Sequence, residues 1–176
     1  MTSVLFEEIY SHFLLKTEPY ELFAPEMTED IRNELLCGFV HSASADPFVR
    51  QLFSVVWLSD PILGEDEAGE LFIDGLLEYE MNIEENEYSD KEFVLDVLSD
   101  GMVLAWIDKT LNSSVNMLQF IGASDTKFYS AANHIQALRD MRNDIALRRD
   151  HMIAARDFIH NDYLNGNISN MKGSTS

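Results

Sequence analysis

Three arginines at a strict spacing of seven are the residues of this chain best placed to act together. Arg142, Arg149 and Arg156 drift by only ~20° per repeat on a straight helix, so they form one basic ribbon. Guanidinium groups bind carboxylates in bidentate geometry, which suits docking onto an acidic surface of another subunit. The alternative is a solvated helix face, helped by Asp144 and Arg148 as an i,i+4 pair.

Histidine, cysteine and glycine patterns predict no catalytic or metal site. His12 follows Glu8 by four residues, but the Glu-x-x-His spacing of di-iron bundles and the His-Glu-x-x-His motif do not occur. No Gly-x-Ser-x-Gly motif and no phosphate-binding glycine loop is present. Cys37 is the only cysteine, which excludes an internal disulfide and a multi-cysteine zinc site. We therefore expect a non-enzymatic protein without a cofactor.

The net charge of −19 is unevenly distributed along the chain. Residues 1–130 hold 26 acidic against 6 basic residues, whereas residues 131–176 hold 5 against 6. Because a surface this negative repels phosphate, we expect no binding of DNA or RNA, although DNA could pass nearby without being held. Solubility alone is the simpler explanation of the acidity.

Apolar periodicity predicts an all-α chain, in which two helices form the centre. A buried central helix is expected at about 90–107, started by a capping box of Ser89 and Glu92. A long C-terminal helix capped by Ser130 follows, at about 130–163. Residues 1–163 are predicted to form a single helical domain, and 164–176 a polar tail that becomes ordered on a partner.

The candidate core lies on these two helices and comprises Phe93, Leu98, Gly101, Trp106, Leu138 and Ile145. A glycine inside a helix costs roughly 1 kcal/mol against alanine, so a close helix crossing would explain Gly101. Leu138, Ile145, Met152 and Ile159 recur every seven residues, which indicates a narrow apolar seam.

Four shorter helices are expected before the central one. They cover residues 3–16 with Ser3 as cap, a segment starting near Thr28, a segment from Asp46-Pro47 to Asp60-Pro61, and residues 70–81. No strand-like alternation and no hairpin turn signal is evident between apolar runs.

Targeting signals and membrane spans are not evident either. No apolar run approaches the ~20 residues that a membrane-spanning helix needs. The amino terminus carries Glu7 and Glu8 in place of the basic start of a signal peptide, so the chain is expected to be cytoplasmic before any assembly.

A set of short motifs lies in the second half of the chain, at residues 101–106, Asn112-Ser113, Asn116, 125–127, 129–133 and Leu138-Arg139, with the arginine-rich helix that follows. Near the amino terminus, Ile9-Tyr10, Phe13-Leu14 and Tyr20-Glu21-Leu22 belong to the same set. Together these motifs resemble those of the head-to-tail connector, or neck adaptor, proteins of tailed bacteriophages. The resemblance covers about half the chain, and it departs from the family at Lys109-Thr110, where such relatives tend to have a proline.

This resemblance implies a virion protein that forms a homo-oligomeric ring beneath the portal, continues the DNA channel and presents a platform to the tail. Its expected partners are the portal and the tail or neck proteins. The candidate subunit or portal interface comprises Arg142, Arg149, Arg156, Asn165, Asn167 and Lys172.

Two other classes of function remain open from the sequence. One is a small acidic binding module that mimics DNA or inhibits a host protein, as the charge and size allow. The other is a helical-bundle enzyme whose site is assembled from scattered carboxylates.

Overall fold

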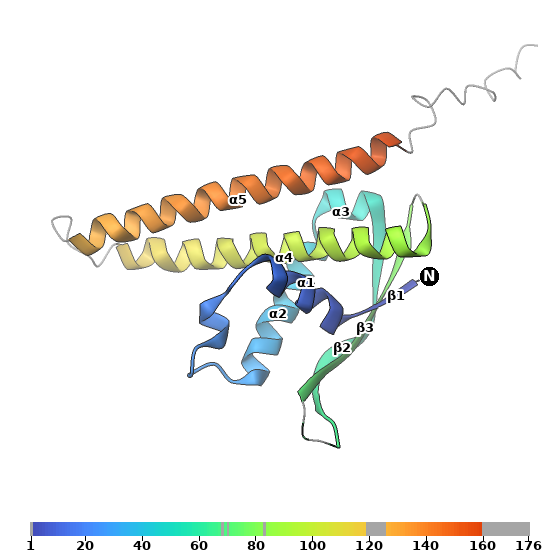
Figure 1. The fold of residues 1–176 in the computed structure, drawn as a ribbon, viewed down its shortest axis with the longest axis horizontal. Coiled ribbons are helices and arrows are strands. Elements are labelled where there is room, and N and C mark those ends of the chain that lie inside the picture. Colours follow the sequence, from blue (N-terminus) through green and yellow to red (C-terminus); the bar gives the residue numbers. More distant parts are fainter. Residues whose placement is uncertain (1, 68, 70, 83, 119–125, 160–176) are drawn as a thin grey trace, which may run out of the picture.

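The computed structural model describes residues 2–67, 69, 71–82, 84–118 and 126–159, and it shows a mixed α/β fold (Figure 1). The all-α prediction is therefore wrong. Its elements in chain order are β1 (Thr2–Leu5), α1 (Phe6–Lys16), a 3-10 turn (Tyr20–Phe23), α2 (Glu29–Ser44), α3 (Pro47–Leu52), β2 (Phe53–Glu65), β3 (Leu71–Met81), α4 (Glu87–Leu118) and α5 (Thr126–Ile159).

The three strands form an antiparallel sheet in the order β1-β3-β2. The predicted helices at 46–61 and 70–81 are thus wrong beyond the short helix α3. Along β2, the inward side chains of Phe53, Val55 and Trp57 alternate with outward Ser54, Val56 and Leu58. Since Val56 and Leu58 are apolar and exposed, both faces carry apolar residues, which hides the period of two in the sequence.

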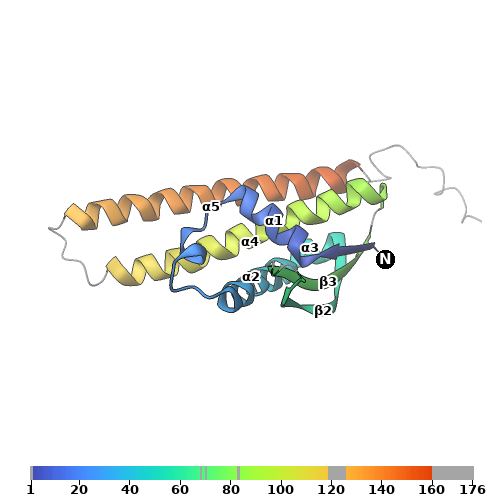
Figure 2. The same ribbon diagram turned by 60° about the horizontal axis from the view of Figure 1, so that its bottom comes forward.

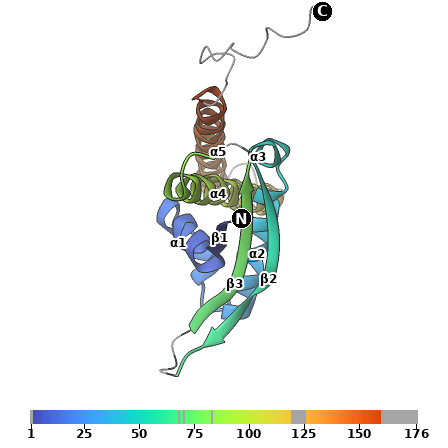
Figure 3. The same ribbon diagram turned by 90° about the vertical axis from the view of Figure 1, so that its right-hand side faces the viewer.

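The strands β2 and β3 form a long hairpin whose tip projects away from the two long helices (Figures 1 and 3). Gly69 takes the positive φ of +82° near its tip, and its N–H donates to the carbonyl of Asp66 at 3.0 Å. The register shifts twice between Trp57 and Ile62.

Helices α4 and α5 run antiparallel along most of the molecule (Figure 2). The predicted cap at Ser89 is wrong, because its backbone N–H donates to Asn86 Oδ1 at 2.9 Å and the helix starts at Glu87. The end predicted near residue 107 is also wrong, since α4 continues to Leu118. Helix α5 begins at Thr126, four residues before the predicted cap at Ser130.

Two of the predicted caps, those at Thr28 and Asp46, are confirmed. Thr28 Oγ1 accepts the N–H of Ile31, and Asp46 Oδ1 accepts the N–H of Phe48 with Pro47 at the first helical position. Ser3 does not cap α1, because Thr2–Leu5 pairs with β3 instead.

Helices α1 and α2 contact α4 on one side and the sheet on the other, so the core lies between these layers. Among the candidate core residues, Phe93, Leu98, Gly101, Leu138 and Ile145 are buried, whereas Trp106 is only partly buried. A Cβ on Gly101 would lie 2.6 Å from Ala43 Cβ on α2. The close helix crossing predicted at this glycine is confirmed.

Candidate functional site

The arginine ribbon of α5 contacts carboxylates of its own chain. Arg142 Nε lies 2.6 Å from Asp108 Oδ1 on α4, and Arg149 Nη2 lies 2.8 Å from Asp46 Oδ2 at the start of α3. Asp46 therefore caps α3 with one carboxylate oxygen and binds Arg149 with the other.

Arg156, at the far end of the ribbon, pairs with Asp90 in the first turn of α4. Its Nη1 also lies 3.7 Å from Glu85 Oε2, and its guanidinium carbon lies 4.5 Å from the centre of the Phe93 ring. The carboxylates and the ring hold this buried cation from three directions.

Along α5, the arginines of the ribbon alternate with the apolar residues of the seam. Both sets therefore lie on the face of α5 that packs against the rest of the fold. Arg149 and Arg156 are only 9% and 7% exposed, beside the buried Leu138 and Ile145. The interpretation of the ribbon as a solvated face is wrong for these two arginines. Polar side chains at single seam positions select one register of a helix pair, and the Arg156–Asp90 pair can do so for α4 and α5.

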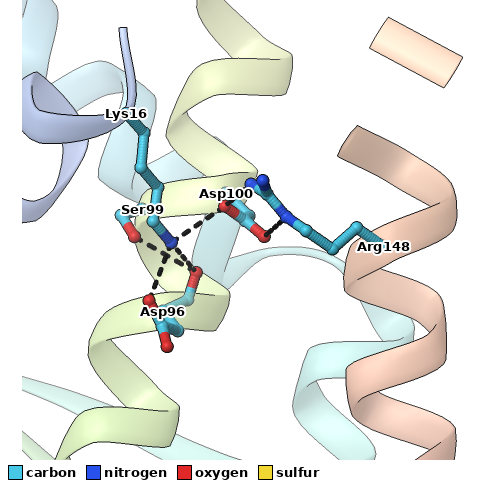
Figure 4. Close-up of polar contacts among 5 residues, drawn as sticks. All are labelled: Lys16, Asp96, Ser99, Asp100 and Arg148. Atoms are coloured by element: carbon cyan, nitrogen blue, oxygen red, sulfur yellow. Dashed lines mark hydrogen bonds and ion pairs between the residues drawn. The ribbon is translucent and has the colours of Figure 1, made fainter. Parts of the chain in front are cut away.

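A second ion-pair cluster links three helices around Asp100, which is 1% exposed (Figure 4). Its Oδ1 accepts from Lys16 Nζ of α1 at 2.9 Å and from Arg148 Nη2 of α5 at 2.6 Å. Arg148 Nε donates to the other oxygen at 3.3 Å, and Lys16 also reaches Asp96 Oδ1 at 2.9 Å. Arg148 is thus engaged with α4, in place of the expected helical pair with Asp144.

Sequence reasoning missed this Asp100 cluster, although one signal was present. Asp96, Ser99 and Asp100 are the polar residues of an otherwise apolar stretch of α4. Because a buried carboxylate needs a cationic partner, this pattern predicts that a lysine or arginine lies nearby. It does not identify Lys16 or Arg148 as that partner.

Ion pairing also changes the pKa of two groups. The hydrogen bond and the charge of Asp108 raise the pKa of Arg142. Burial opposes ionisation of Glu8, but Lys91 and the Leu5 amide outweigh it, so its pKa is lowered. Lys91 Nζ lies 2.7 Å from Glu8 Oε1 and ties α4 to the start of α1.

These clusters join elements of the fold through pairs of opposite charge. Within the described ranges, no group of three histidine, cysteine or carboxylate side chains is placed to hold a metal ion. Glu8, considered beside His12 from the spacing of four, instead binds Lys91. The predicted interface residues Asn165, Asn167 and Lys172 lie outside the described residues.

Surface charge follows from this pairing. Of the ten lysines and arginines whose side chains the structure describes, seven form ion pairs with carboxylates of the same chain. The stretch 51–90, which includes both hairpin strands, contains twelve acidic residues and no lysine or arginine. This stretch, called the arm below, thus carries negative charges only.

None of the described helices is both long and apolar enough to cross a membrane. Comparisons with protein-family models, curated proteins and solved structures found no match. The resemblance to phage connector proteins therefore stays a prediction from the sequence motifs.

Proposed function

We propose that this chain is a structural virion protein of a tailed bacteriophage, a head-to-tail connector that forms a ring between portal and tail. The observation that supports this proposal is that most described cationic side chains pair with carboxylates of their own subunit. Seven of the ten described lysines and arginines neutralise carboxylates of their own subunit, which leaves the remaining surface anionic. An anionic wall lets DNA pass without holding it, as a conduit requires.

The fold is compatible with such a part. A long helical pair braced by buried ion pairs gives a rigid strut, and the projecting hairpin gives a separate contact surface (Figures 1 and 3). Subunit and portal contacts remain proposed for the C-terminal region, including Asn165, Asn167 and Lys172.

The test is the mass of the full chain and of a variant lacking residues 165–176. We expect a discrete ring for the full chain, alone or with a portal protein, and its loss in the truncated variant with unchanged circular dichroism. A full chain that stays monomeric both alone and with portal protein would contradict the proposal.

An acidic binding module remains the second candidate, favoured by the absence of any basic residue between positions 51 and 90. A monomer that binds a DNA-binding protein and competes with duplex DNA for it would favour this candidate over the connector.

A further inference from the structure

The outer face of the three-stranded sheet is uncovered by any described helix (Figure 3). On the inner face, Trp57 stacks on His41 of α2 with 3.8 Å between ring centres, and Phe53 and Leu77 are buried. The strand alternation places Val56, Ile62 and Phe72 on the opposite face, together with Leu5 of β1. All four are exposed, Ile62 by 65%.

Acidic side chains accompany these apolar ones on the same face. Asp74 is paired with Ile62 across the two strands, Glu78 with Val56, and Glu80 with Ser54. Exposed apolar residues rimmed by a single sign of charge are typical of a protein-binding surface. Here the sign of the rim is negative.

An acidic cavity of about 310 Å³ adjoins this face at the base of the hairpin, and Glu80 belongs to both. Its walls include Glu84 and Asp90, and Asp90 is neutralised by Arg156. Glu80 and Glu84 form no ion pair with any described residue. The carboxylates of this cavity therefore exceed the one cation beside them.

Tyr79 lines the same cavity beside Thr2, and its buried hydroxyl lies within reach of the Thr2 side chain. Its side chain belongs to the inner face of the sheet, where Tyr79 is paired with Val55, so the groups offered to a ligand are the carboxylates. Carboxylates around a cavity of this size suit the donors of one guanidinium.

The charge of the arm also selects among possible occupants. A second copy would bring the same acidic face, and nucleic acid would bring phosphates, so both are repelled. Addition of a strand to the free edge of β2 is hindered by Pro61 and by the register shifts between Trp57 and Ile62. On β2, the face rather than the edge is therefore left for binding.

We infer that the outer face of the sheet and the adjoining cavity form one docking surface for a basic, partly apolar segment of a different protein. An arginine of that segment enters the cavity, where the carboxylates of Glu80 and Glu84 accept its hydrogen bonds. Apolar side chains of the segment cover Val56, Ile62 and Phe72. This inference goes beyond the proposed ring, since each subunit carries the whole surface.

The test uses a labelled synthetic peptide in which arginine alternates with leucine, measured by fluorescence anisotropy with the full-length chain at physiological salt. Two double variants probe the surface: Glu80→Gln with Glu84→Gln in the cavity, and Ile62→Ser with Phe72→Ser on the face. The control, Glu26→Gln with Asp144→Asn, removes the same charge from exposed positions elsewhere.

We expect each surface variant to bind the peptide about tenfold more weakly than the unmodified chain, with the control unchanged. Lysine in place of arginine in the peptide should also weaken binding, because an ammonium cannot reproduce the guanidinium geometry. Equal weakening by the control, or no binding by the unmodified chain, would overturn the inference. Circular dichroism of each variant checks that the fold is retained, and the result is independent of ring formation.

Discussion

Two ion pairs of the arginine ribbon join α5 to α4 but differ in burial, which allows a matched comparison. The side chains of Arg156 and Asp90 are 7% and 8% exposed, whereas those of Arg142 and Asp108 are 41% and 47% exposed. We consider Arg156→Met and Arg142→Met, because methionine resembles arginine in helix propensity and in the reach of its side chain.

The expected magnitudes follow from what each substitution leaves behind. Arg156→Met leaves the carboxylate of Asp90 buried without its cation, which costs about 3–5 kcal/mol of unfolding free energy. The N–H of Glu85 still donates to Asp90 at 3.2 Å, so we expect the lower part of that range. Arg142→Met leaves Asp108 in contact with water, and an exposed pair contributes about 0–1 kcal/mol.

Denaturant unfolding followed by circular dichroism measures both variants under the same conditions. Adding Asp90→Asn to Arg156→Met should recover part of the loss, because the unpaired charge is removed. Equal destabilisation by the two arginine variants would refute the assignment of these pairs as buried and exposed. By the same reasoning, reversing all three arginines to glutamate should destabilise the subunit itself.

Three further predictions concern single positions. Gly101→Ala should cost about 1–3 kcal/mol, because its Cβ would meet Ala43 of α2, and Ala43→Gly should restore most of the loss. Trp106→Ala should cost less than the ~3–5 kcal/mol of a fully buried aromatic residue, since Trp106 is partly buried; an unfolding curve shifted by that full amount would contradict this. Burial, with Asp60 and Glu34 nearby, raises the pKa of the Cys37 thiol. Its alkylation rate should therefore still rise above pH ~8.5, where an ordinary thiol is half ionised, and a plateau below that pH would be the contrary result.

The caps at Thr28 and Asp46 were predictable from the sequence, whereas those at Ser3, Ser89 and Ser130 were predicted wrongly and the sheet was missed. Thr28 and Asp46 act on backbone groups two or three residues away, so a local pattern can indicate them. Before α4 more than one polar residue could serve, and Asn86 accepts the N–H of Ser89. The hairpin depends on pairing across the turn, and the outward apolar residues Val56, Leu58 and Ile62 mask its alternation. The same residues make the outer face a candidate docking surface. Exposed apolar side chains on this face therefore explain both why the strand was missed in the sequence and why the face is proposed as a binding site.

The ribbon itself was predictable, but its partners were not. A spacing of seven fixes that three arginines share one direction on a helix, but it cannot reveal what lies in that direction. Their carboxylates come from positions 34, 66 and 103 residues away, on α4 and at the start of α3. Only the folded arrangement of these elements shows that the ribbon faces inward.

Internal pairing of the cations also determines how the anionic arm acts at a distance. Exposed charges are screened over about 8 Å at physiological salt, so a carboxylate on the hairpin acts only on a partner almost in contact with it. Lys16, Arg148 and Arg156 are held within the ion-pair clusters of α4 and α5, whereas residues 51–90 carry no cation of their own. In the proposed connector, DNA that passes the arm beyond this range would be neither held nor repelled, while a basic segment that reaches the sheet face would meet unneutralised carboxylates. A passive channel wall and a specific protein contact can therefore coexist on one subunit.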